Sequence, residues 1–288
     1  METKTQQNIT TQPDRFGLAW QSSTDAWAVC AQYDGFWLTF SPNRKTIWRF
    51  WQWQMSESAA LPENQVNVYQ LFSLPARQAW RQADRLAKKA NRTISLEDMF
   101  LALLKQRSVA QLFVKLKINP REAFALLENY AKISPPATNN LIKQLPFVAF
   151  ALAANLRHDK IGSLMLLGAL VELAPQSSMV AAIFSNIGLD AQKWWLVTAW
   201  VLHVPLRLPQ EGINEDLAYC CWQAQNLEQM FGCYFEFPAV ETALKAAAAK
   251  NAATLRQHAL KLLVKAAGLA KQKKRKTITE RLVLQAAA

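Results

Sequence analysis

The chain contains two stretches in which the same apolar residues recur in the same order. The first spans residues 94–124 and the second residues 161–195. When Ile94 is aligned with Ile161, the apolar positions coincide, apart from a four-residue insertion in the second stretch. The matched pairs are Met99 with Leu166, Phe100 with Leu167, Leu103 with Leu170, Val109 with Val180, Phe113 with Phe184, Leu116 with Ile187 and Ile118 with Leu189. A repeat of this length indicates a duplicated supersecondary unit that packs against its own copy, which is typical of a binding scaffold.

The apolar spacing within each copy predicts helices. Only 8 glycines and 12 prolines occur in 288 residues, which favours helices over turn-rich β structure. Asn119 followed by Pro120 and Glu122 is a strong helix-start signal. We expect helices near 74–91, 96–105, 108–117 and 120–132 in the first copy, and near 141–156, 163–173, 178–187 and 191–202 in the second. The predicted fold class is therefore mainly α, with tandem pseudo-twofold four-helix repeats, a small N-terminal β-sheet and a basic helical C-terminal region.

Residues 1–65 form the first predicted region, a disordered start followed by a small sheet rich in tryptophan. Two β-like runs flank Asp34 and Gly35, a strong hairpin signal, and residues 45–54 alternate as a further strand does. Residues 56–65 read as a polar linker. The aromatic side chains are expected to cover one face of the sheet and dock on helices, while stacking on nucleobases or holding a peptide is the alternative.

The second predicted region covers residues 66–203, the duplicated helical domain, and the third covers residues 204–288. In the third, residues 204–213 read as a linker, 215–230 as a helix and 231–237 as a short aromatic loop or strand. Residues 239–270 are alanine-rich and predict one helix, or two that break near Asn251. Residues 271–276 form a charged connector, and Thr277 is the expected N-cap of a last short helix.

Positive charge concentrates in this third region. The chain carries a net charge of +12, and residues 241–288 hold eleven Lys or Arg against two Glu. This surplus could attract phosphates or anionic lipid through counterion release. The alternative is a solvated connector with no ligand, since charge runs are usually solvated. The candidate anion-binding residues are Lys261, Lys265, Lys271, Lys273, Lys274, Arg275 and Lys276.

The repeat resembles the Clp N-terminal repeat found at the front of Clp-type AAA+ unfoldases. Residues 93–104, TISLEDMFLALL, match the centre of that repeat, and Val109-Ala110 and residues 116–119 match its later part. In the second copy Val180-Ala181 and residues 187–190 match closely, but Ser163 to Met165 replace the acidic helix start. Residues 276–283 also resemble, faintly, the small helical lid of AAA+ proteins. The chain has no GxxxxGK[ST] motif, so the ATPase modules of that family are absent from it.

This resemblance implies a compact, all-helical domain that receives substrate proteins or adaptors and performs no chemistry itself. Possible partners are then a Clp-type unfoldase or its substrates, held in a groove between the two copies. The candidate partner-binding residues are Arg77, Arg81, Thr93, Ser95, Glu97, Asp98, His158, Lys160 and Ser163. Because the polar edges of the two copies differ, we expect one copy to contribute more to binding than the other.

Motifs for catalysis are missing from the sequence. It has no HExxH, no GxSxG and no Cys–His spacing typical of a nucleophile or a metal site. His203 lies in an apolar run, which predicts a structural core histidine. Four cysteines without a CxxC indicate reduced thiols in the cytoplasm, and the N-terminus lacks the apolar core of a signal peptide. We therefore expect no enzyme activity, no cofactor and no metal.

Three function classes follow. The first is a non-enzymatic, adaptor-like protein- or peptide-binding module built on the repeat. The second is nucleic-acid or anionic-surface binding through the basic tail, although no aromatic residue follows Phe237 to stack on bases. The third is a structural subunit of a larger assembly, in which the tryptophan-rich sheet is the contact surface.

Overall fold

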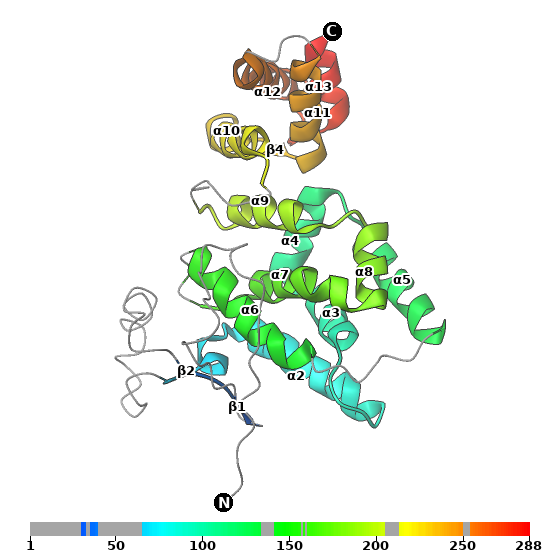
Figure 1. The fold of residues 1–288 in the computed structure, drawn as a ribbon. Helices are drawn as coiled ribbons and strands as arrows, with labels where there is room; N and C mark the ends of the chain where they lie inside the picture. Colours follow the sequence, from blue (N-terminus) through cyan, green and yellow to red (C-terminus); the bar gives the residue numbers. More distant parts are fainter. Residues whose placement is uncertain are drawn as a thin grey trace, which may run out of the picture. The chain divides into compact units, whose positions relative to one another are not determined.

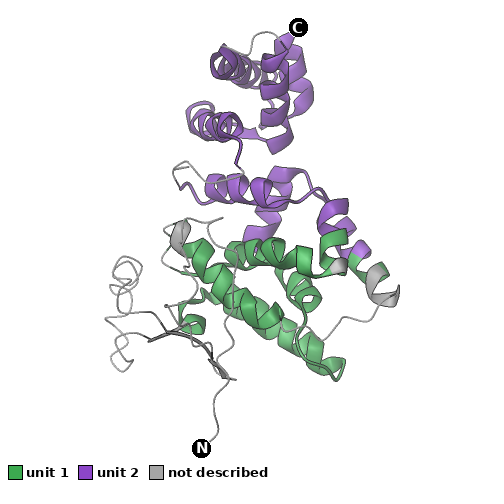
Figure 2. Ribbon diagram, viewed as in Figure 1, with its two compact units in different colours: residues 1–106, 127–182 green, residues 107–126, 183–288 purple. Residues whose placement is uncertain are grey.

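A computed structural model describes residues 30–32, 35–39, 65–133, 141–156, 158, 160–204, 213–249 and 254–288. In these ranges the chain is mainly helical (Figure 1), in agreement with the predicted class. The described residues divide into two compact units, coloured separately in Figure 2. Unit 1 takes residues up to Gln106 and 127–182, and unit 2 takes residues 107–126 and 183–288.

The α-helices of unit 1 come from the first half of each predicted repeat copy. They are the 3-10 helix η1 (Val68–Leu71), α2 (Leu74–Lys89), α3 (Leu96–Leu104), α6 (Leu141–Asn155), α7 (Ser163–Leu173) and the 3-10 helix η2 (Ala174–Gln176). In this unit α2 packs on α3, α6 on α7, and α3 on α7. Helix α7 carries apolar side chains on all of its faces, and nearly all of its residues are buried, as expected for a core helix.

Short strands accompany these helices in unit 1. Strands β1 (Cys30–Gln32), β2 (Gly35–Thr39) and β3 (Gln65–Asn67) form an antiparallel sheet in the order β1-β2-β3. An isolated parallel bridge joins Phe72, just before α2, to Ile161, just before α7. The Ile161 N–H donates to the Leu71 carbonyl at 2.9 Å, and the Ser73 N–H donates to the Ile161 carbonyl at 3.0 Å. This bridge ties the segments that precede α2 and α7.

Unit 2 joins the remaining repeat helices to the C-terminal region. It contains α4 (Arg107–Leu116), α9 (Ala191–Val201), α10 (Glu215–Phe231), α11 (Phe237–Ala248), α12 (Leu255–Gln272) and α13 (Glu280–Ala287). The boundary between the units falls inside α5 (Pro120–Ile133) and α8 (Ser178–Asn186). Two short strands, β4 (Tyr234–Phe235) and β5 (Thr277–Ile278), pair in parallel. Helix α4 packs on α9, and α10 to α13 pack on one another.

The predicted helix positions of both copies are confirmed to within two residues at each end. Two helices, α11 and α12, form in the alanine-rich segment. The N-cap prediction at Thr277 is wrong, because Thr277 lies in β5 and Thr279 occupies the N-cap of α13. Gln65, expected in the linker, and Val66 and Asn67, expected to be helical, form β3 instead. The predicted strand at 45–54 and the predicted linker at 56–65, apart from Gln65, lie outside the described residues, and the predicted domain boundaries stay predictions.

No single helix in the described ranges is both long and apolar enough to cross a membrane. Residues 163–176 and 179–186 reach that length and composition only as a bent pair.

Candidate functional site

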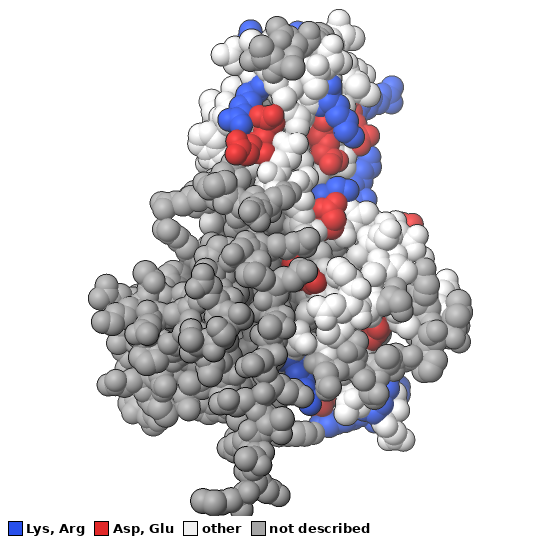
Figure 3. Space-filling model, viewed as in Figure 1, with Lys and Arg blue, Asp and Glu red and all other residues white. Residues whose placement is uncertain are grey.

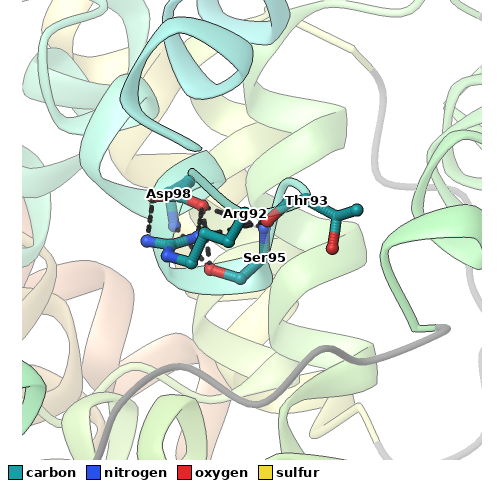
Figure 4. A network of polar contacts seen from close by, with 4 residues as sticks. All are labelled: Arg92, Thr93, Ser95 and Asp98. Carbon is teal, nitrogen blue, oxygen red and sulfur yellow. Dashed lines mark hydrogen bonds and ion pairs between the residues drawn. The ribbon is translucent and has the colours of Figure 1, made fainter. Parts of the chain in front are cut away.

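Ser95 and Asp98 form a capping box at the start of α3. The Asp98 N–H donates to the Ser95 hydroxyl at 3.3 Å, and the Ser95 N–H donates back to the Asp98 carboxylate at 3.0 Å. Arg92 adds an ion pair, with one guanidinium nitrogen on each carboxylate oxygen (Figure 4). These bonds satisfy free N–H groups at the helix start and neutralise a buried carboxylate. The hydrogen bond to Asp98 raises the pKa of the Arg92 guanidinium.

Four of the predicted partner-binding side chains are buried in the interior of unit 1. Ser95 and Asp98 are each 2% exposed, Glu97 is 7% exposed and Ser163 is 1% exposed. The burial of the first two follows from their capping role, which makes them part of the helix start rather than of the surface. Gly162 precedes α7 at the corresponding place and provides no side-chain cap.

The other predicted partner-binding residues reach the surface of unit 1. Arg81, Thr93 and Lys160 are exposed, while Arg77 and His158 are partly exposed. Arg77 donates to the Gln70 carbonyl at 2.8 Å, so its guanidinium is held against η1. His158 Nδ1 lies 2.8 Å from the Lys160 carbonyl.

A polar groove lies between α2 and α3, and sequence reasoning identified only one residue of it, Arg81. The groove has a volume of about 340 Å³. The residues that line it are Gln78, Arg81, Gln82, Arg85, Ala102, Lys105 and Gln106. The available sequence signal was the four-residue spacing of Arg81 and Arg85, and of Gln78 and Gln82, which places each pair on one face of a helix. Three cations and no carboxylate line this groove, so it favours an anionic ligand.

The seven predicted anion-binding residues are all exposed in unit 2. They lie on α12 and in the connector that follows it, and two of them contact α13. Lys265 Nζ donates to the Ala286 carbonyl at 3.5 Å, and Lys273 Nζ donates to Gln285 Oε1 at 2.8 Å. On the face drawn in Figure 3, acidic and basic side chains are interspersed over the C-terminal helices. The basic tail is accessible to an anion, although carboxylates accompany it.

A buried lysine in unit 2 forms a cluster that the sequence did not predict. Lys115, near the end of α4, is 3% exposed at its side chain, and its Nζ lies 2.5 Å from Glu228 Oε1 on α10. The same ammonium lies 3.9 Å from the ring centroids of both Trp200 and Tyr234. Cation–π attraction to two rings and one ion pair therefore compensate for lost hydration. We call Lys115, Glu228, Trp200 and Tyr234 the lysine cage.

Glu228 satisfies further donors around the lysine cage. Trp200 Nε1 donates to Glu228 Oε2 at 2.9 Å, and the Phe235 N–H donates to Oε1 at 2.6 Å. Burial lowers the pKa of Lys115 despite the attraction of Glu228, and burial raises the pKa of the Tyr234 hydroxyl. The carboxylate thus joins α4, α9 and β4 to α10. Because the lysine is enclosed, the cage is suited to holding unit 2 together and not to meeting a ligand.

Two neighbouring thiols on α10 are also enclosed in unit 2. Cys220 is 1% exposed and Cys221 is fully buried, and both are free. Burial raises the pKa of Cys220 to about 12 and raises that of Cys221 well above its ordinary value. Both groups stay protonated in the folded chain at pH values where exposed thiols ionise.

The raised pKa values of these two thiols predict that the folded protein loses stability in alkaline solution. A thiol whose pKa is raised on folding stabilises the protein fully below its unfolded pKa, near 9.0. That contribution is lost as the pH rises from about 9 to about 12 for Cys220. Replacing Cys220 and Cys221 with alanine should therefore flatten the decline of the unfolding free energy with pH in this window. Urea unfolding at several pH values measures it, and an unchanged slope would contradict the assignment.

His203 is exposed, so the prediction of a core histidine is wrong. It follows α9 in a left-handed conformation, with φ of 54°, and its Nδ1 lies 2.8 Å from Gln225 Nε2. His203 therefore lies just after the C-terminal end of α9 and is not part of the apolar face of that helix. In the part of the chain that the structure describes, no group of three or more His, Cys, Asp or Glu side chains is arranged to hold a metal ion.

Comparison with known proteins adds no identification: no protein-family model matches the chain, and no curated protein matches it.

Proposed function

We propose that this chain is a non-enzymatic protein- or peptide-binding module, adaptor-like, with a duplicated Clp-N-like scaffold that recruits a partner or substrate protein. Two observations support the duplication, one from the core and one from the turns. Most of the matched apolar residues are buried in both copies, with Met99, Phe100 and Leu103 on α3 and their counterparts on α7 all 0% exposed. The step from a duplicated scaffold to partner binding rests on what the resemblance to the Clp N-terminal repeat implies.

The turn after the third helix of each copy has the same hydrogen-bond pattern, a helix-ending motif that also follows α2, α9 and α12. Lys117 and Gly188 occupy matched positions and are both left-handed, with φ of 61° and 66°. The next N–H donates back to a matched phenylalanine carbonyl, from Ile118 to Phe113 at 2.8 Å and from Leu189 to Phe184 at 2.9 Å.

The following residue then caps the next helix in each copy. Asn119 accepts from the Arg121 N–H at 3.0 Å, and Asp190 accepts from the Lys193 N–H at 2.8 Å. A left-handed residue costs free energy for any side chain but glycine, and Lys117 is one of four non-glycine residues that adopt this conformation at helix ends in the described chain. The turns therefore agree with a duplication, and the matched buried residues of α3 and α7 are the observation that carries the proposal.

A photo-crosslinking amino acid placed at exposed positions of the full chain tests this function. We propose that the partner contacts the repeat, so crosslinks to it should form from Thr93 or Lys160, which are exposed on unit 1. Lys271, exposed at the end of α12, should give few. Crosslinks from Lys271 alone would favour the basic tail as the binding element. Partner capture that falls steeply with salt and is abolished by deletion of residues 241–288 would point the same way.

Binding of nucleic acid or an anionic surface through the tail is the second candidate. It is favoured by one observation, the exposure of all seven tail cations. Neutralising Lys271, Lys273 and Lys274 with glutamine should then weaken retention on an anionic resin while leaving crosslinks from Thr93 unchanged.

A further inference from the structure

The groove between α2 and α3 points to the kind of partner that the repeat receives. Its lining combines three cationic side chains, Arg81, Arg85 and Lys105, with three carboxamides and a small floor residue, Ala102. The nearest acidic residue along α2, Asp84, is already paired with Lys88 at 2.7 Å. Among the described residues, no carboxylate forms an ion pair with the three groove cations. The groove on the first repeat copy is therefore positively charged, and no carboxylate of the described residues neutralises it.

The chemistry of the lining favours a polypeptide ligand. Arginine forks bind carboxylates with two parallel hydrogen bonds, and Arg81 and Arg85 are one helical turn apart. Gln78, Gln82 and Gln106 each offer a donor and an acceptor, which is what a peptide backbone presents. No aromatic side chain lines the groove, so it lacks the stacking surface on which single-stranded nucleic acid depends.

We propose that the α2/α3 groove binds an acidic segment of the partner polypeptide, with Arg81 and Arg85 holding its carboxylates and the glutamines holding its backbone. This inference rests on the proposed function, since it names the partner of the repeat. It also agrees with the expectation that one copy contributes more than the other. Because the ion pairs form at an exposed surface, each adds modestly and the affinity depends on several of them together.

Fluorescence anisotropy with defined probes tests the groove. The probe is a labelled peptide of about a dozen residues with several glutamates, measured at about 0.15 M salt, where charges beyond about 8 Å are largely screened. Its twin carries glutamine in place of glutamate, and a single-stranded oligothymidine of similar length tests for general polyanion binding. We expect the acidic peptide to bind and the other two to bind at least about tenfold more weakly, a difference of about 1.4 kcal/mol.

The matched variants are Arg81→Gln with Arg85→Gln in the groove, and Lys261→Gln with Lys265→Gln on α12. Both pairs are exposed, both have four-residue spacing and both remove the same charge. Glutamine keeps helix propensity, so neither pair should unfold the chain. We expect the groove variant to weaken peptide binding about tenfold and the α12 variant to change it less than about twofold. Arg81→Lys with Arg85→Lys keeps the charge but loses the arginine forks, so its affinity should lie between that of the unaltered chain and that of the glutamine variant.

Three outcomes would overturn the proposal: equal loss in both variants, tighter binding of the oligothymidine than of the peptide, or no peptide binding at all. Failure of the groove can be separated from failure of the proposed function. If crosslinks to the partner still form from Thr93 in the Arg81→Gln/Arg85→Gln chain, the repeat binds its partner elsewhere. If these crosslinks never form in the unaltered chain, the proposed function itself is wrong.

Discussion

Replacing Glu228 with leucine should lower the free energy of unfolding by about 3–5 kcal/mol, the usual cost of removing one partner of a buried ion pair. Lys115 would keep its charge in a site where its side chain is 3% exposed. Two further donors, Trp200 Nε1 and the Phe235 N–H, would lose their acceptor. An unsatisfied buried donor costs about 1–3 kcal/mol, so the whole cluster depends on this one carboxylate.

A surface glutamate on the same helix provides the control. Glu215 lies at the start of α10 with its side chain 61% exposed, and it pairs with Arg256 at 3.4 Å. Replacing it with glutamine should cost less than about 1 kcal/mol, as is typical of exposed pairs. Urea unfolding followed by circular dichroism measures both. A Glu228→Leu effect as small as the control would mean that the lysine cage does not hold unit 2 together.

The double variant Lys115→Met with Glu228→Leu separates charge from packing. Removing both charges eliminates the isolated ammonium, and a pair replaced by apolar side chains of similar volume is often close to neutral. The loss of two hydrogen bonds to Glu228 remains. We therefore expect the double variant to be more stable than Glu228→Leu alone, and a double variant that is less stable would contradict the ion-pair account.

The second large effect is expected at the capping box of α3. Asp98→Ala removes the acceptor for the Ser95 N–H and hydroxyl, at 3.0 and 3.1 Å, and leaves the Arg92 guanidinium without its ion-pair partner. Loss of an N-terminal cap costs about 1 kcal/mol and loss of a buried ion-pair partner costs more. Since the Arg92 side chain is 24% exposed, water can recover part of its solvation, and we expect a total of about 2–4 kcal/mol.

Asp190→Ala is the matched control for the capping box. Asp190 also precedes a repeat helix and accepts a hydrogen bond at its start, from the Lys193 N–H at 2.8 Å. Its side chain is 58% exposed, however, and water can replace that bond. We expect a loss of about 1 kcal/mol at most. Thermal unfolding of both variants should show the larger shift for Asp98→Ala, and equal shifts would rule out a special role for its burial.

The helices could be predicted from the sequence because local signals define them. Asn119 with Pro120 begins α5, Ser95 begins α3, and apolar spacing gives the rest. The lysine cage could not be predicted, because Lys115 and Glu228 are 113 residues apart and only the fold brings them together. The two-residue strands β4 and β5 are too short for any alternation to be visible in the sequence.

Site residues were harder to predict for a related reason. Polar residues at a helix start look the same in sequence whether they are exposed or buried. The polar groups of Ser95 and Asp98 are occupied by capping hydrogen bonds at the start of α3, whereas Arg81 on α2 lines an open groove. The difference comes from the packing of α2 on α3, which the spacing of either helix alone does not reveal.

The central claim is that the repeat, and not the basic tail, receives the partner. Crosslink yield from Thr93 compared with that from Lys271, in the full chain and in the same lysate, measures it most directly. The account predicts one partner protein crosslinked from Thr93 at several times the yield from Lys271, unchanged when the tail lysines are replaced with glutamine. Equal yields from both positions, or a partner found only from Lys271, would contradict it.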